Sequence, residues 1–110
     1  MYITVVIPFK DEEKNLKILL PQLAKILKHQ KEKFELILVN DASSDKSLEI
    51  CKKYKSDFEQ IKILDLSIHS GQTGAFKEAF KIANGEFLIR MDADLQDNPK
   101  DLNLFVEKFK

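Results

Sequence analysis

The sequence predicts an α/β fold in which helices flank a parallel β-sheet. Short apolar, β-branched runs alternate along the chain with segments whose apolar residues recur at helical spacing, as expected for a parallel sheet with helical crossovers. No repeat, low-complexity tract or linker interrupts this alternation. With 44% apolar and 33% charged residues, the 110-residue chain has a globular composition. We therefore expect one domain over residues 1–110.

The first half of the chain contains three predicted strands and two helices. Residues 3–7 form an apolar run closed by Pro8, which should end the strand because proline donates no backbone hydrogen bond. Apolar residues from Leu16 to Leu27 then follow a helical pattern, in which Pro21 predicts a kink or a late start. Residues 34–39 and 61–64 read as strands, with a helix over about residues 46–58 between them.

The second half adds two helices around a fourth strand, residues 87–91. Thr73 is the predicted N-cap of the first helix, and Asn84 and Gly85 should end that helix. The apolar face of this helix should comprise Phe76, Ala79, Phe80 and Ala83. A last helix is expected after Pro99, ending near residue 109.

Charge and hydropathy exclude several classes of function. Eighteen basic and eighteen acidic residues balance, so no net positive field attracts nucleic acid. No apolar stretch approaches the roughly 20 residues that span a bilayer, and no signal peptide precedes the first strand, so we expect a cytoplasmic location. Cys51, the single cysteine, lies on an apolar helix face and is predicted to pack in the core.

The segment after the fourth strand predicts a metal site. If the backbone stays extended, Asp92, Asp94 and Gln96 point to one side, because strand side chains alternate. Oxygen ligands of this kind suit a hard divalent cation, Mg²⁺ or Mn²⁺, which completes its shell with water and substrate phosphates. The pattern indicates a metal–diphosphate site.

Further acidic residues follow the other predicted strands. In open α/β sheets, ligands bind beyond the carboxyl ends of the strands. A structural alternative is that acids at these positions cap helix N-termini. That alternative accounts for residues 11–13 and for Asp45, but less well for Asp92 and Asp94, since Asn98 and Pro99 already begin the next helix.

Four segments in order carry a family resemblance: residues 6–8 with Glu12, 39–45, 70–75 and 91–99. Together they resemble the nucleotide-binding half of family-2 inverting glycosyltransferases of the A-type fold. The Asp-Ala-Asp-Leu-Gln form is most similar to the dolichyl-phosphate mannosyltransferase-like branch, whose members glycosylate polyprenyl phosphates. The resemblance implies a Rossmann-like, truncated sheet of the nucleotide-diphospho-sugar transferase type.

The resemblance also implies a substrate and a site. A UDP- or GDP-linked sugar would bind near Pro8, Glu12, Asp41 and Asp92, and a cation on Asp92, Asp94 and Gln96 would bridge to its diphosphate. The sugar would pass with inversion to an acceptor such as polyprenyl phosphate. The full-length parent would then work at the inner face of the membrane.

Two departures from the family pattern stand out. Ala42 replaces the usual glycine, and alanine resists the positive φ that glycine accepts. The family continues well past the metal motif, whereas this chain ends at Lys110, so the catalytic base is not assigned to any residue here. We expect a donor-binding half that binds metal and nucleotide weakly, forms homodimers and transfers no sugar alone.

Two other interpretations remain open. One is a non-catalytic remnant that binds nucleotide without transfer. The other is a receiver-like, Mg²⁺-binding signalling domain, in which Asp65 at the end of the third strand would accept the phosphoryl group.

Overall fold

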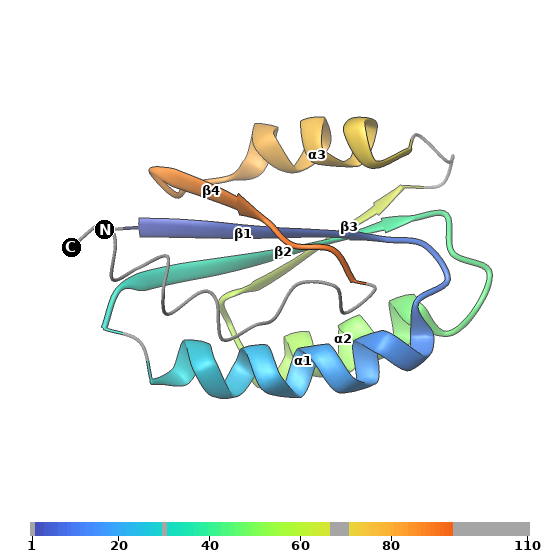
Figure 1. The fold of residues 1–110 in the computed structure, drawn as a ribbon, viewed down its shortest axis with the longest axis horizontal. Helices are drawn as coiled ribbons and strands as arrows, with labels where there is room; N and C mark the ends of the chain where they lie inside the picture. The colour runs from blue at the N-terminus through green and yellow to red at the C-terminus, as the bar shows by residue number, and fades with distance from the viewer. Residues whose placement is uncertain (1, 30, 67–70, 94–110) are drawn as a thin grey trace.

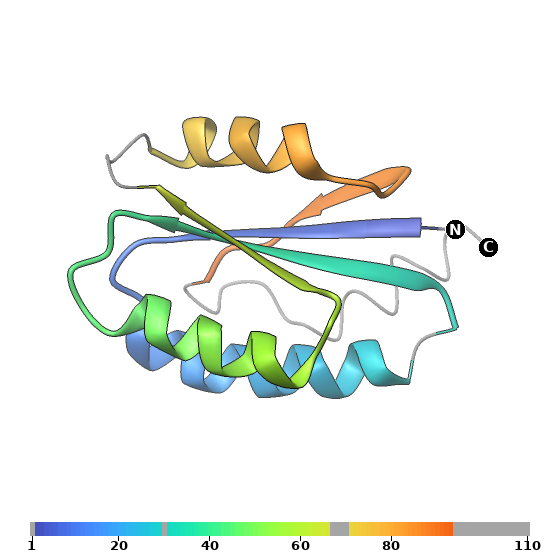
Figure 2. The same ribbon diagram turned by 180° about the vertical axis from the view of Figure 1, so that it is seen from behind.

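The computed structural model describes residues 2–29, 31–66 and 71–93, which form a three-layer α/β fold. Its parallel sheet has the order β3-β2-β1-β4. The strands are β1 (Tyr2–Phe9), β2 (Lys33–Asp41), β3 (Ile61–Leu66) and β4 (Phe87–Arg90). Helices α1 (Glu13–Lys28) and α2 (Ser47–Asp57) cover one face, and α3 (Gly71–Ile82) covers the other (Figures 1 and 2). Within these ranges, no helix is long and apolar enough to cross a membrane.

The strand order places the point where the chain changes direction between β1 and β4. The chain runs outward from β1 through β2 to β3 and then returns across the sheet through α3 to β4, on the other side of β1. Ligands in such sheets bind at this switch point, beyond the carboxyl ends of the strands. A receiver domain has β1 between β2 and β3, so the receiver interpretation is wrong.

Two apolar clusters hold the layers together. The larger one lies between the sheet and α1 and α2, and includes Ile3, Val5, Ile7, Leu16 and Leu23. The smaller one lies under α3, where Ala75 and Ala79 pack on Val6, Ile37 and Val39. Cys51 belongs to the larger cluster, and burial raises the pKa of its thiol to about 12, which confirms its packing role.

The predicted end of the first strand at Pro8 is wrong, because β1 continues to Phe9 and both residues remain paired with β2. The carbonyl of Val6 accepts the N–H of Met91 on the β4 side, at 3.0 Å. Pro8 lies two residues further and faces the same side, beyond the last pair of the β1–β4 ladder. Its missing donor therefore costs the β1–β2 ladder nothing.

Two details of the helices also differ from expectation. α1 begins at Glu13, so Pro21 lies inside it and does not delay its start. α3 begins at Gly71, which places Thr73 inside the first turn instead of at the N-cap. On α3, Ala79 is buried, but Phe80 is 64% exposed, because it lies one residue further round the helix, away from the sheet. The helix predicted after Pro99 lies outside the described residues.

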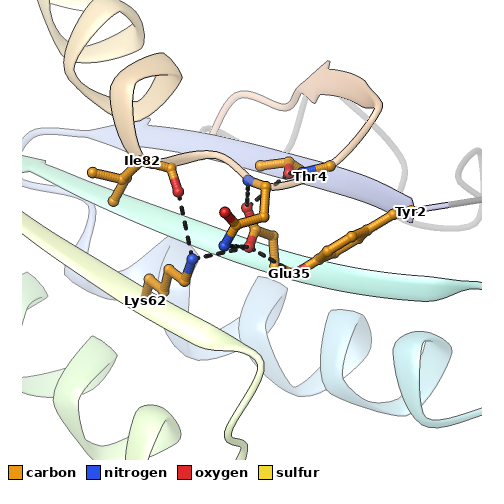
Figure 3. A network of polar contacts seen from close by, with 7 residues as sticks. Tyr2, Thr4, Glu35, Lys62 and Ile82 are labelled. Atoms are coloured by element: carbon orange, nitrogen blue, oxygen red, sulfur yellow. Dashed lines mark hydrogen bonds and ion pairs between the residues drawn. The ribbon is translucent and has the colours of Figure 1, made fainter.

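A buried carboxylate, Glu35 on β2, joins the amino ends of all four strands (Figure 3). It accepts hydrogen bonds from the hydroxyls of Tyr2 at 3.0 Å and Thr4 at 2.8 Å, both on β1. The ammonium of Lys62 on β3 lies 3.0 Å from the Glu35 carboxylate. The backbone N–H of Asn84, just before β4, donates to the same carboxylate at 2.7 Å. We call these five residues the Glu35 network.

The hydrogen bonds of this network decide the charge state of Glu35. Burial alone would raise the pKa of the carboxyl, but the bonds from Asn84, Lys62, Thr4 and Tyr2 outweigh burial and lower the pKa to about 2. The side chain is only 3% exposed, so solvent screens these bonds little. Glu35 is therefore ionised in the folded chain at neutral pH.

Glu35→Gln should flatten the acid limb of the stability profile. The carboxylate stabilises the fold above the usual glutamate pKa of 4.5, and this contribution is lost as the pH falls towards about 2. Between about pH 5 and about pH 2, the free energy of unfolding should fall by about 3 kcal/mol more in the wild type than in the variant. Urea unfolding across this range measures the difference, and parallel profiles would contradict it.

Candidate functional site

The loops that follow β1 and β2 are joined by hydrogen bonds at the carboxyl edge of the sheet. One carboxylate oxygen of Asp11 accepts the backbone N–H of Ser44 at 2.6 Å and that of Asp45 at 3.2 Å. In return, the N–H of Asp11 donates to the hydroxyl of Ser43 at 3.0 Å. Asp11 therefore fixes the position of the second loop.

The same loops cap the N-termini of α1 and α2 reciprocally. The Asp45 carboxylate accepts the N–H of Glu13, in the first turn of α1, at 3.2 Å and that of Ser47, in the first turn of α2, at 2.9 Å. Glu13 in turn accepts the N–H of Lys46 at 3.0 Å. Burial would raise the pKa of Asp45, but its bonds to Ser47 and Glu13 lower it. The capping interpretation is thus confirmed for Asp45, which binds the first turns of both helices, and for Glu13, which binds the N-cap residue of α2. Asp11 instead bonds loop residues before α2, and Glu12 makes no cap hydrogen bond.

Both loops contain a residue with positive φ. Asp11 has φ 54° and Ala42 has φ 59°. Aspartate adopts this left-handed region more readily than most residues. Alanine is destabilised there, because its Cβ comes too close to the backbone. Ala42 thus adopts the positive φ that glycine accepts and that alanine resists.

Asn40, near the end of β2, links this strand to Asp65 on β3 and to the loop that follows β2. Asn40 donates from Nδ2 to Asp65 on β3 at 2.9 Å and accepts the N–H of Ser43 through Oδ1 at 3.1 Å. A carboxylate at position 40 could not make the first bond and would face Asp65 with a like charge. The hydrogen bond from Asn40 to Asp65 was not predicted from the sequence, although two adjacent polar residues, Asn40 and Asp41, at the end of an apolar strand were a signal for it.

Three of the predicted nucleotide-binding residues lie at the ends of β1 and β2. Pro8 is buried in β1, and Asp41 is buried as the last residue of β2. Glu12 is half-buried at the N-cap of α1, where its side chain makes no cap hydrogen bond and instead accepts the amide of Asn15 at 2.7 Å. The structure therefore brings these residues to one edge.

Asp92, the fourth, follows β4 at the same edge. Arg90 is paired with Val6, so Asp92 comes near the level of Pro8 on the neighbouring strand. Its side chain is 34% exposed and lies 3.3 Å from the guanidinium of Arg90. Asp94 and Gln96, the other predicted metal ligands, lie outside the described residues.

The described residues contain no complete metal site. Over residues 2–29, 31–66 and 71–93, no group of three or more His, Cys, Asp or Glu side chains could hold a metal ion. The exposed carboxylate of Asp92 nevertheless has the hard oxygen chemistry that Mg²⁺ and Mn²⁺ require. Asp92 thus fits one position in a coordination shell that other ligands must complete.

Two cavities lie away from the strand ends that carry Asp41 and Asp92. One, of about 610 Å³, lies at the opposite edge of the sheet between α1 and α2, near Leu27, Phe34 and Phe58. The other, of about 370 Å³, lies beside the N-terminus of α1; Asp11, Glu13 and Asp45, which accept backbone N–H groups there, line it together with Glu12. The chemistry therefore points to the strand ends rather than to either cavity.

Comparison with known proteins gives a consistent result. The sequence profile described as Glycosyl transferase family 2 matches residues 4–110. An uncharacterized glycosyltransferase of Synechocystis sp. is 38% identical over 109 residues, which are 98% of this chain and 34% of that protein. An undecaprenyl-phosphate 4-deoxy-4-formamido-L-arabinose transferase of Photorhabdus laumondii is 39% identical over 107 residues, 96% of this chain and 33% of that protein. The chain thus spans about a third of the length of these relatives.

Solved structures show the same architecture. Residues 1–349 of S. aureus TarS, in complex with UDP-GlcNAc, superpose with a TM-score of 0.81 and 32% identity, covering 97% of this chain and 30% of that one. A mannosyltransferase from Pyrobaculum calidifontis, in complex with GDP-Man and Mn²⁺, gives a TM-score of 0.82 over 96% of this chain and 31% of that one. Its identity is 21%, so this second likeness concerns the fold alone.

Ala42→Gly should stabilise the protein. Relief of the left-handed strain, about 1–2 kcal/mol, exceeds the extra entropy that glycine gives the unfolded chain, so the free energy of unfolding should rise by about 0.5–1 kcal/mol. Ala24→Gly, inside α1, is the matched control and should lower it by about 1 kcal/mol. Urea unfolding of both variants measures the two effects, and a loss of stability in Ala42→Gly would contradict the argument.

Proposed function

Because the chain belongs to glycosyl transferase family 2, we propose that it forms the donor-binding part of an inverting glycosyltransferase. A nucleotide-diphosphate sugar lies across the carboxyl edge of the sheet, at the switch point between β1 and β4. Its base and ribose lie near Pro8, Glu12 and Asp41, and its diphosphate lies near Asp92. Asp92, with Asp94 and Gln96, holds Mg²⁺ or Mn²⁺.

The observation that carries this proposal is the position of Asp92. It follows the strand on one side of β1, while Asp41 ends the strand on the other side. We assign Asp41, Asp92 and Glu12 to the ligand, whereas Asp11, Glu13 and Asp45 accept backbone N–H groups of the two loops. The complex of TarS with UDP-GlcNAc, at 32% identity, supports a nucleotide sugar as that ligand.

Each group has a defined task in the proposed transfer. Asp41 accepts a hydrogen bond from the base, and Asp92 contributes one carboxylate to the cation. The cation, when bound, offsets the charge that develops on the departing nucleoside diphosphate, an effect worth several kcal/mol. The acceptor oxygen attacks the anomeric carbon from the face opposite the diphosphate, which inverts the configuration.

Polyprenyl phosphate is the acceptor that we propose for the full-length protein, working at the inner face of the membrane. The names of two relatives support it: the undecaprenyl-phosphate transferase of Photorhabdus laumondii and a dodecaprenyl-phosphate galacturonate synthase of Rhizobium johnstonii. A phosphate oxygen is already anionic and needs little help from a protein base. Incubation of the full-length protein with radiolabelled nucleotide sugar and polyprenyl phosphate tests transfer, and binding without transfer would favour the non-catalytic remnant.

Nucleoside diphosphate binding should require a divalent cation. Calorimetry with UDP and GDP should detect binding in Mn²⁺ or Mg²⁺ and a loss of at least about tenfold in affinity in EDTA, since the carboxylates and the diphosphate otherwise repel each other. Asp94→Asn and Asp92→Asn should each abolish the metal-dependent part. Because the Arg90–Asp92 pair is exposed, Asp92→Asn should change the free energy of unfolding by no more than about 1 kcal/mol.

Asp57→Asn is the matched control for this test, because it removes the same charge at the opposite edge of the sheet, at the end of α2. It should leave nucleotide affinity unchanged. Equal nucleotide affinity of the wild type in EDTA and in Mn²⁺ would rule out the metal role.

Asp41→Ala should weaken nucleoside diphosphate binding by about 1–3 kcal/mol, because a donor of the buried base would lose its partner. The residue is the last of β2 and therefore lies at the carboxyl edge of the sheet. Calorimetry against Asp57→Ala, at the far edge, separates this effect from loss of charge. Unchanged affinity in Asp41→Ala would place the base elsewhere.

A further inference from the structure

The strand that leads to Asp92 is held to the sheet over a short length. β4 pairs with β1 through four residue pairs, from Ile3–Phe87 to Val6–Arg90. A shift of one residue along such a ladder turns every side chain to the opposite face and moves it by about 3.3 Å. The position of Asp92 at the carboxyl edge therefore depends on what fixes the register of β4.

Three consecutive backbone N–H groups fix the chain just before β4. Asn84 donates to Glu35 at 2.7 Å, Gly85 donates to the Thr4 hydroxyl at 2.9 Å, and Glu86 donates to the carbonyl of Tyr2 at 2.8 Å. Gly85 lies so close to β1 that a Cβ there would clash with the hydroxyl oxygen and the backbone nitrogen of Thr4. A shift of the segment along β1 would move these three N–H groups away from their acceptors.

The Glu35 carboxylate orients this contact (Figure 3). Thr4 donates its hydroxyl proton to Glu35 at 2.8 Å, so the lone pairs of its oxygen remain to accept from Gly85. Glu35 thus acts on the segment before β4 twice, directly through Asn84 and indirectly through Thr4. Glu35 and Thr4 are buried, which strengthens the bond between them.

We propose that Glu35 is a positioning residue, which sets the register of β4 on β1 and thereby delivers Asp92 to the carboxyl edge beside the end of β1. It touches neither cation nor nucleotide, and it acts from the amino edge of the sheet through Thr4 and the segment before β4. Its effect on ligand binding rests on the proposed function, whereas its effect on the register of β4 does not.

Amide hydrogen exchange in the 110-residue chain tests the register directly. In Glu35→Gln, the amides of Glu86 and Met91, which bond to the carbonyls of Tyr2 and Val6, should exchange at least about tenfold faster than in the wild type. The amide of Leu16 in α1, bonded to the carbonyl of Glu12, is the internal reference and should change much less. An equal acceleration at all three amides would mean general destabilisation and would overturn the proposal.

Two further variants sharpen the result. Thr4→Val keeps the buried carboxylate and its Lys62 partner but removes the link to Gly85, so it should reproduce the selective exchange at Glu86 and Met91. If Glu35→Gln fails to fold, Thr4→Val tests the proposal by itself. Leu23→Ala, in the core under α1, lowers stability without touching the network and should accelerate no β4 amide selectively. A selective change at Glu86 and Met91 in Leu23→Ala, or none in Thr4→Val, would overturn the proposal.

Nucleotide titration supplies the functional readout. Glu35→Gln should weaken the Mn²⁺-dependent binding of UDP or GDP by at least about tenfold and leave any binding in EDTA unchanged, because Asp92 acts through the cation. Wild-type affinity in a variant whose β4 amides exchange faster would overturn the link to Asp92. Absence of Mn²⁺-dependent binding in the wild type would instead refute the proposed function, and the exchange data would still decide whether Glu35 sets the register.

Discussion

One ionised side chain in the interior holds the amino ends of the four described strands in place. Glu35 accepts hydrogen bonds from two hydroxyls on β1, the ammonium of Lys62 on β3 and the backbone N–H of Asn84 before β4. A buried charge is tolerated only when such partners are complete, so loss of any one of them leaves the remainder poorly satisfied. The network therefore couples strands that are distant in sequence, and it ties the end of α3 to the same point through the bond from Lys62 to the Ile82 carbonyl.

The two edges of the sheet have different roles. The amino edge carries the Glu35 network, which aligns the strands, and the carboxyl edge carries the residues that we assign to the ligand. Local hydrogen bonds join the two loops at the carboxyl edge, since Asp11 accepts backbone donors of the second loop and Asp45 accepts donors of both segments. Ala42 shows that this arrangement is strong enough to hold a residue in a conformation it disfavours.

Much of this architecture follows from the sequence. Apolar periodicity located all four strands and the three described helices, because burial of one face imposes the period of each element. The acidic residues at the strand ends could also be predicted, since parallel strands bring their carboxyl ends to one edge. Contacts between distant residues could not: nothing local in the sequence pairs Glu35 with Asn84, or Asn40 with Asp65. The error at Pro8 has the same origin, because the cost of a missing donor depends on which neighbouring strand it faces. A glutamate inside an apolar strand was the one local signal of the network.

The reciprocal caps have a consequence for how an anion could be held. A helix N-terminus carries roughly half a positive charge and is a common seat for phosphate. Here the chain's own carboxylates, Asp45 and Glu13, already occupy the N-termini of α1 and α2. These carboxylates offset the dipoles of α1 and α2, whereas the first turn of α3 contains no acidic residue. In the function that we propose, a bound cation would supply the attraction for a diphosphate that α1 and α2 do not, and capture of the ligand would depend on the concentration of that cation.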